Sequence, residues 1–162
     1  MVSWGELEHE RPDLASKGRA ILYQFGVGLG FLATVALDGR PRVHPICPVL
    51  SDDALFAFIV PSPKQGDLRR DGRYSLHSFP CPDNEDAFYL AGTARLVEDH
   101  AAREHLGAQF VLERSSIGVE LPSGDHLLFE LGIESCLLTS TSGHGDPSPR
   151  HVVWRPPGSG AT

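Results

Sequence analysis

The sequence is poor in the features that mark several common protein classes. It has three cysteines, Cys47, Cys81 and Cys136, and no C-x-x-C motif. An odd number of scattered thiols argues against a disulfide framework and favours a reducing compartment. No run approaches the ~20 apolar residues that a membrane-spanning helix needs, and the acidic start lacks the basic and then apolar order of a signal peptide. These absences predict a soluble cytoplasmic protein with no membrane partner.

Positive charge is also scarce. The 14 Lys+Arg against 21 Asp+Glu give a formal net charge of -7, and only Lys17 and Lys64 are lysines. An acidic domain repels phosphate backbones, so we expect no nucleic-acid partner. The sequence contains no G-x-S-x-G and no H-E-x-x-H motif, and its eight histidines show no metal-ligand spacing. Neither a serine hydrolase nor a metal site is predicted.

What is present is ordinary for a globular chain. Its 162 residues suit one domain, and 41% hydrophobic with 22% charged residues excludes a disordered, collagen-like or coiled-coil protein. We expect a single domain over residues 1–155, which begins with a helical segment over 1–26. Residues 156–162 are rich in Pro, Gly and Ser and predict a flexible tail.

Cap and turn signals divide the chain into elements. Ser3 and Glu6 fit a capping box, and Pro12 fits the start of a second helix that ends near Gly26. Asp38-Gly39 between two strand-like runs predicts a hairpin. The second of these runs contains prolines and should be irregular or at a sheet edge. The expected strands cover 31–37, 41–50, 54–60, 73–79, 87–97, 126–141 (with a bulge) and 150–155, and further helices cover 63–71 and 99–112, capped by Ser62 and Asp99.

This order of elements predicts the architecture. Strands joined by tight turns cannot form a doubly wound parallel sheet. An antiparallel barrel, closed or nearly closed and covered by helices, hides the strand edges instead. The stretch 26–30, Gly-Val-Gly-Leu-Gly, is similar to a dinucleotide-binding fingerprint. However, a helix precedes it and a strand follows, which is the reverse of the Rossmann order. We therefore expect these glycines to end the helix.

Three places in the sequence could meet a ligand. Arg42 and His44 share one face of a strand, which could equally be solvent-exposed. Ser62, Pro63 and Lys64 stand where a strand feeds a helix, and a helix start with a lysine suits a phosphate. The same residues also suit an ordinary helix cap beside a solvated lysine. Trp154 could pack in the core or a dimer interface, or stack on a flat ligand.

Taken together and in this order, these segments resemble the pyridoxamine 5'-phosphate oxidase-like family, the split β-barrel proteins that bind FMN or the deazaflavin F420. The matching segments are 30–45, 55–60, 62–64, 67–77 and 89–97. The resemblance implies a mainly β (α+β) fold, an antiparallel split β-barrel with flanking helices. It also implies a homodimer with cofactor sites at the subunit interface.

The resemblance also implies a set of cofactor-binding residues. In the family, the second strand and the end of the third flank the flavin ring and ribityl chain, Ser-x-Lys binds the phosphate, and a C-terminal aromatic approaches from the partner. The corresponding residues here are Arg42, Val43, His44, Pro45, Phe58, Ile59, Val60, Ser62, Lys64 and Trp154.

The implied function is a flavin-dependent oxidoreductase with FMN as cofactor. Residues 149–156 do not match the segment with which pyridoxamine phosphate oxidases hold their substrate, so we expect another, unidentified small molecule. Three alternatives stay open. They are an F420-dependent reductase, a non-enzymatic haem or ligand binder with His44, His77 and His126 as candidate iron ligands, and a structural dimer module with a filled pocket.

Overall fold

The computed structural model describes residues 1–158; residues 159–162 lie outside the described part. It begins with α1 (Trp4–Glu10) and α2 (Pro12–Leu22). The capping box is confirmed, because the Ser3 hydroxyl accepts a hydrogen bond from the Glu6 N–H at 3.2 Å and the Glu6 carboxylate accepts one from the Ser3 N–H at 2.7 Å. Helix α2 ends at Leu22, earlier than the expected Gly26.

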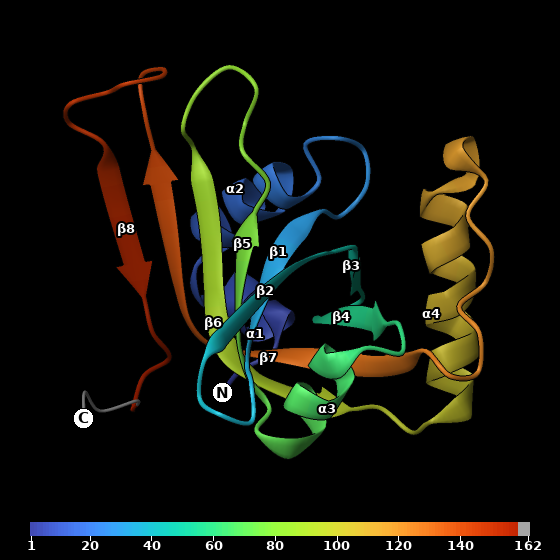
Figure 1. Ribbon diagram of the computed structural model, residues 1–162. Helices are drawn as coiled ribbons and strands as arrows, with labels where there is room; N and C mark the ends of the chain where they lie inside the picture. Colours follow the sequence, from blue (N-terminus) through green and yellow to red (C-terminus); the bar gives the residue numbers. More distant parts are fainter. Residues whose placement is uncertain (159–162) are drawn as a thin grey trace.

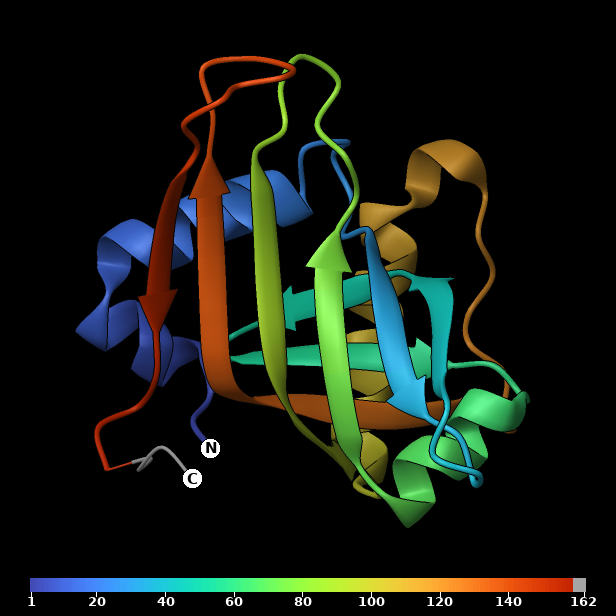
Figure 2. The ribbon, with the colours of Figure 1, turned by 60° about the vertical axis from the view of Figure 1, so that its left-hand side comes forward.

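The eight strands within residues 1–158 form one antiparallel sheet. Its strand order is β2-β1-β5-β6-β7-β4-β3, and β8 pairs with β7. The strands are β1 (Gly30–Val35), β2 (Pro41–Ile46), β3 (Pro48–Ser51), β4 (Ala54–Ile59), β5 (Arg73–Ser78), β6 (Ala87–Leu96), β7 (Leu127–Ser140) and β8 (Arg150–Trp154). In Figure 2 the long strand β7 turns sharply. Its first half pairs with β4 and its second half with β8. The sheet therefore curls into a half-barrel, and the predicted mainly β fold is confirmed.

The expected strand over 41–50 is corrected, because the chain breaks at Cys47 into β2 and β3. Strand β2 pairs with β1, whereas β3 pairs with β4 on the other side of the curled sheet. One continuous strand could not serve both neighbours. Both pieces lie at the ends of the strand order, where prolines cost no ladder hydrogen bonds.

The predicted bulge lies in β7. Ala91 pairs with Ser135 but Gly92 pairs with Ile133, so Glu134 is the extra residue. A Cβ atom on Gly92 would collide with the carbonyl oxygen of Gly132. Glycine is therefore required where β6 faces this bulge.

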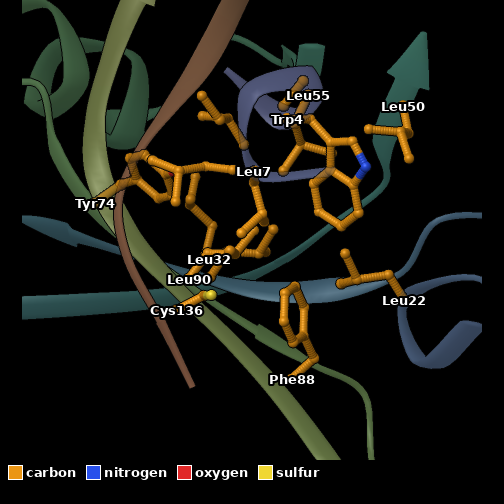
Figure 3. Close-up of a cluster of buried hydrophobic side chains, with 14 of the residues drawn as sticks. Trp4, Leu7, Leu22, Leu32, Leu50, Leu55, Tyr74, Phe88, Leu90 and Cys136 are labelled. Carbon is orange, nitrogen blue, oxygen red and sulfur yellow. The ribbon is translucent and has the colours of Figure 1, made fainter. Parts of the chain in front are cut away.

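The main core lies between the N-terminal helices and the concave face of the sheet. Figure 3 shows Trp4 and Leu7 of α1 packed among side chains such as Phe88 and Leu90 of β6. The expected last strand ends inside this core, since Trp154 is only 9% exposed. Pro156 is buried as well, so the beginning of the expected tail is packed against the protein.

Two helices complete the structure and lie near β4. Helix α3 (Pro63–Arg70) follows β4 directly, and α4 (His100–Glu113) stands beside β3 and β4 (Figure 1). Asp99 caps α4 as expected, because its carboxylate accepts a hydrogen bond from the Ala102 N–H at 2.7 Å. A second hydrophobic cluster of Val49, Leu106 and Leu128 packs α4 against the sheet.

Residues 1–158 can be examined for a membrane-spanning helix, for disulfides and for a metal site. None of their helices combines the length and apolarity required to cross a membrane. The three cysteines are unpaired thiols. No group of three or more His, Cys, Asp or Glu side chains in this part of the chain is arranged to hold a metal ion.

Candidate functional site

A pocket of about 420 Å³ lies where β2, β4, α3 and α4 meet. Its walls include Phe58 and Val60 at the end of β4, Phe110 of α4 and Lys64 of α3. The segment 119–123, which follows α4, provides a further wall, and His126 precedes β7. The volume is within the range of roughly 300–1,000 Å³ that is typical of small-molecule sites.

Lys64 brings a positive charge to this pocket. It stands in the first turn of α3 and is only 9% exposed. Within residues 1–158 no carboxylate forms an ion pair with its ammonium group, and burial lowers its pKa. A buried cation without a partner is costly. An anionic ligand at this place would therefore be stabilising.

Asp67, the acidic residue nearest to Lys64 in the sequence, has other partners. Asp67, one turn along α3, is buried and accepts a hydrogen bond from the Thr34 hydroxyl at 2.9 Å. Its carboxylate also lies 3.4 Å from Arg42 and 3.4 Å from Arg70. Asp67 thus fixes α3 to the β1–β2 hairpin, and within residues 1–158 it forms no ion pair with Lys64.

His44 adds an unsatisfied polar atom beside this lysine. Its Nε2 is buried and has no hydrogen-bond partner in the described part of the chain. Burial lowers its pKa, and the nearby charges of Lys64 and Arg42 lower it further. Buried polar atoms normally have partners, so the imidazole marks a position where a polar ligand atom could bind.

Two aromatic rings form an apolar wall of the pocket. Phe58 and Phe110 meet edge to face with their centroids 5.7 Å apart. The guanidinium groups of Arg103 and Arg114 lie 5.6 Å and 4.0 Å from the centroids of Phe58 and Phe110, respectively. Each ring therefore packs against the other ring and against a guanidinium group, which restricts its orientation.

The comparisons with known proteins concern the fold. No family model matches the sequence, and no curated protein matches it. Among solved structures, a protein of the pyridoxine phosphate oxidase family from Clostridium acetobutylicum, related to general stress protein 26, matches with a TM-score of 0.59 at 13% identity. The match covers 93% of this chain and 95% of that one. The chain has the split-barrel fold of the pyridoxamine 5'-phosphate oxidase-like proteins.

Two further split barrels are similar to this one. General stress protein 26 from Bacillus anthracis has a TM-score of 0.59 at 18% identity, over 76% of this chain and 91% of that one. A haem-binding protein from Mycobacterium smegmatis has a TM-score of 0.66 at 20% identity over 90% of this chain. The present chain spans only 59% of that mycobacterial protein.

The split barrel brings together part of the predicted cofactor set. Pro45, Phe58, Val60 and Lys64 line the pocket. Ile59 does not, since side chains alternate along a strand and Ile59 points into the core, where it is 1% exposed.

The other predicted cofactor-binding residues are not in the pocket lining. Val43 is 60% exposed. Arg42 and His44 share the face that carries Thr34 and Leu32 of β1, as expected from their spacing. Trp154 is not in the pocket lining, because it packs in the core of its own chain and pairs with Cys136.

Ser62 occupies the N-cap position of α3, but the predicted side-chain cap is wrong. Its hydroxyl donates a hydrogen bond to the Val60 carbonyl at 2.8 Å, and no cap bond forms to the helix. The turn after β4 provides this carbonyl close to the hydroxyl. The first turn of α3 beside Lys64 is therefore left without a side-chain cap.

The sequence did not predict the wall formed by 119–123, nor the contribution of Cys47 and Phe110. The available signal was Val119-Glu120-Leu121-Pro122, a loop in which apolar side chains flank a single carboxylate, Glu120. His126 was considered only as an iron ligand. It lines the pocket, and its Nδ1 contacts the Ser123 hydroxyl. His77, in contrast, is exposed, and its Nδ1 lies 2.7 Å from the Ser78 carbonyl.

Proposed function

We propose that the pocket binds FMN and that the protein is a flavin-dependent oxidoreductase acting on a small molecule other than pyridoxamine phosphate. The observation that carries this proposal is Lys64, a largely buried side chain that lines a ligand-sized pocket and has no counter-ion among residues 1–158. The phosphate of FMN would supply the missing negative charge through charge-assisted hydrogen bonds. The adjoining helix start favours the same anion.

The other pocket residues suit the remaining parts of this cofactor. Phe58, Phe110 and Val60 offer apolar surface to a flat ring. His44 on the adjoining strand β2 does not line the pocket, but its Nε2 has no hydrogen-bond partner within residues 1–158 and is a polar contact for a ligand that reaches it. Lys64 and Ser62 would hold the phosphate, with Arg42 close by. When bound, FMN would supply hydride or single-electron transfer. The protein's own part is to bind the cofactor, orient it and exclude water.

The proposal includes a homodimer. Val43 on β2 and Val60 after β4 are 60% and 44% exposed, and Val60 also lines the pocket. Exposed apolar side chains beside a ligand site suit an interface that completes it. The three unpaired thiols favour a cytoplasmic location.

Haem is the second candidate ligand. His126 lies in the pocket wall, and because its Nδ1 contacts Ser123, its Nε2 is the nitrogen left for iron. The similarity in fold to the mycobacterial haem-binding protein supports this alternative. F420 is a further alternative to FMN, since it also carries a phosphate and a tricyclic ring.

Titration of the purified protein with FMN, F420 and haem separately tests these proposals. We expect FMN fluorescence to be quenched on binding, and Lys64→Met to weaken binding at least tenfold, because one charge-assisted contact is worth roughly 1.5–3 kcal/mol. Lys17→Met is the matched control, since Lys17 is the other lysine and is exposed. Absence of FMN binding would reject the first proposal. F420 binding or a Soret band would then support the respective alternative.

A further inference from the structure

Arg103 connects three parts of the pocket wall without lining the pocket itself. It is a half-buried residue of α4. Its guanidinium donates one hydrogen bond to the Ser123 carbonyl at 2.5 Å and another to the His126 carbonyl at 2.6 Å. The same group lies 5.6 Å from the centroid of the Phe58 ring. Ser123, His126 and Phe58 all line the pocket.

A second side chain fastens the same segment from the opposite side. The Gln65 amide on α3 donates hydrogen bonds to the Ile59 carbonyl at 2.6 Å and to the Asp125 carbonyl at 2.9 Å. Helix α4 and helix α3 therefore both hold residues 123–126. The residues just before, 119–122, have no such fastening of their own in the described part of the chain, although they contribute much of the wall.

We propose that Arg103 is a positioning residue of this site: it holds segment 119–126 in place as the outer wall of the pocket and thereby slows release of the bound ligand. The inference rests on the proposed function for the identity of that ligand, FMN. The planar guanidinium reaches two carbonyls at once, which a lysine ammonium on a flexible chain does not reproduce. Arg103 acts through the wall, not through contact with the ligand.

Loss of the Arg103 contacts should have one effect in the free protein and another in the FMN-loaded protein. In the free protein, loss of the two carbonyl contacts should let segment 119–126 open more often, while the sheet stays closed. In the loaded protein, more frequent opening should raise the rate of FMN release more than it changes the rate of binding, because a ligand leaves only when the wall is open.

Arg103→Lys tests this in two measurements. In hydrogen exchange of the ligand-free protein, we expect the His126 amide, which donates a hydrogen bond to the Ser123 carbonyl at 3.1 Å, to exchange about tenfold faster, as expected for the loss of one charge-assisted hydrogen bond. Amides of β5 and β6 should keep their rates. In FMN release after dilution, we expect a similar increase in rate. Arg73→Lys is the control, since Arg73 is exposed and pairs only with Asp71 among the described residues.

The outcomes separate the two proposals. Unchanged exchange of the His126 amide, or an equal increase in β5 and β6, would overturn the positioning role whether or not FMN binds. If the wild-type protein fails to bind FMN, the proposed function is rejected, while the exchange measurement still decides the role of Arg103. Faster exchange with an unchanged release rate would overturn the link between the wall and ligand release.

Discussion

At the scale of single residues, Lys64 carries a conflict between stability and binding. Its side chain is largely buried, its ammonium group has no counter-ion in the described part of the chain, and burial lowers its pKa. A core-facing apolar side chain of similar length would fit the same space at lower cost. Residues kept despite such a cost are typical of binding sites, where a ligand supplies the missing partner.

We therefore expect Lys64→Met to stabilise the ligand-free protein by about 1 kcal/mol, since replacing a partly desolvated, unpaired charge by an apolar group removes a desolvation penalty that solvent in the pocket reduces. Urea unfolding measures the change. Lys17→Met, at an exposed position, should leave stability within about 0.5 kcal/mol. A destabilised Lys64→Met protein would mean that the ammonium group has a favourable partner in the free protein.

His44 predicts a pH dependence of stability. Burial and the neighbouring charges of Lys64 and Arg42 lower the pKa of His44 below its ordinary value of 6.5. Between these two pKa values the unfolded chain binds a proton that the folded chain does not, so stability falls as the pH drops through this window. At pH values above both pKa values, His44 is neutral in the folded and in the unfolded chain, and it then costs no stability.

His44→Gln should remove this part of the acid sensitivity while keeping a polar side chain. The measurement is the free energy of unfolding from about pH 7.5 downward in the ligand-free variant and wild type. We expect the wild-type curve to fall more steeply just below pH 6.5, the ordinary pKa of the imidazole. Parallel curves would show that His44 binds its proton equally well in both states.

At the scale of elements, the bulge in β7 explains a glycine in β6. Glu134 is inserted opposite Gly92, and the Gly132 carbonyl then occupies the space where a Cβ atom would lie. This carbonyl belongs to the backbone, which cannot relieve the clash by changing rotamer as a side chain can. The bulge lies at the sharp turn that lets β7 pair with β4 and then with β8.

Gly92→Ala should destabilise the protein by about 1–3 kcal/mol, the usual cost of overpacking, and urea unfolding again gives the value. Gly66→Ala in α3 is the matched control, because a Cβ atom at that position would meet nothing within 4 Å. There an alanine should stabilise by about 0.5–1 kcal/mol. Equal effects of the two substitutions would rule out a steric role for the bulge.

At the scale of the whole molecule, the proposed dimer determines whether the site is complete. Light scattering should give twice the 17.6 kDa mass of one chain. Val43→Glu should produce monomers and weaken FMN binding, since it replaces an exposed apolar side chain, two residues before Pro45 of the pocket wall, by a charge. Arg73→Glu, a change at another exposed strand position, should leave the mass unchanged. A monomeric wild-type protein would contradict the proposal.

Local signals in the sequence determined most elements and the fold class. The capping box at Ser3, the Asp38-Gly39 turn and the cap at Asp99 depend on residues three or fewer apart, so their effect is visible without tertiary structure. The strand and helix order then left an antiparallel barrel as the natural way to hide the edges. The position of Lys64 at a helix start was predicted for the same local reason.

Only the tertiary structure decided which of these residues share a pocket. Residues 119–126 follow α4 in the chain, yet they face β4 and α3 because Arg103 and Gln65 bind their carbonyls. The break at Cys47 likewise follows from two strands needing different neighbours. Local preference extends over a few residues, whereas burial of Lys64, the unpaired His44 Nε2 and the pocket wall arise from contacts between segments that are distant in the chain.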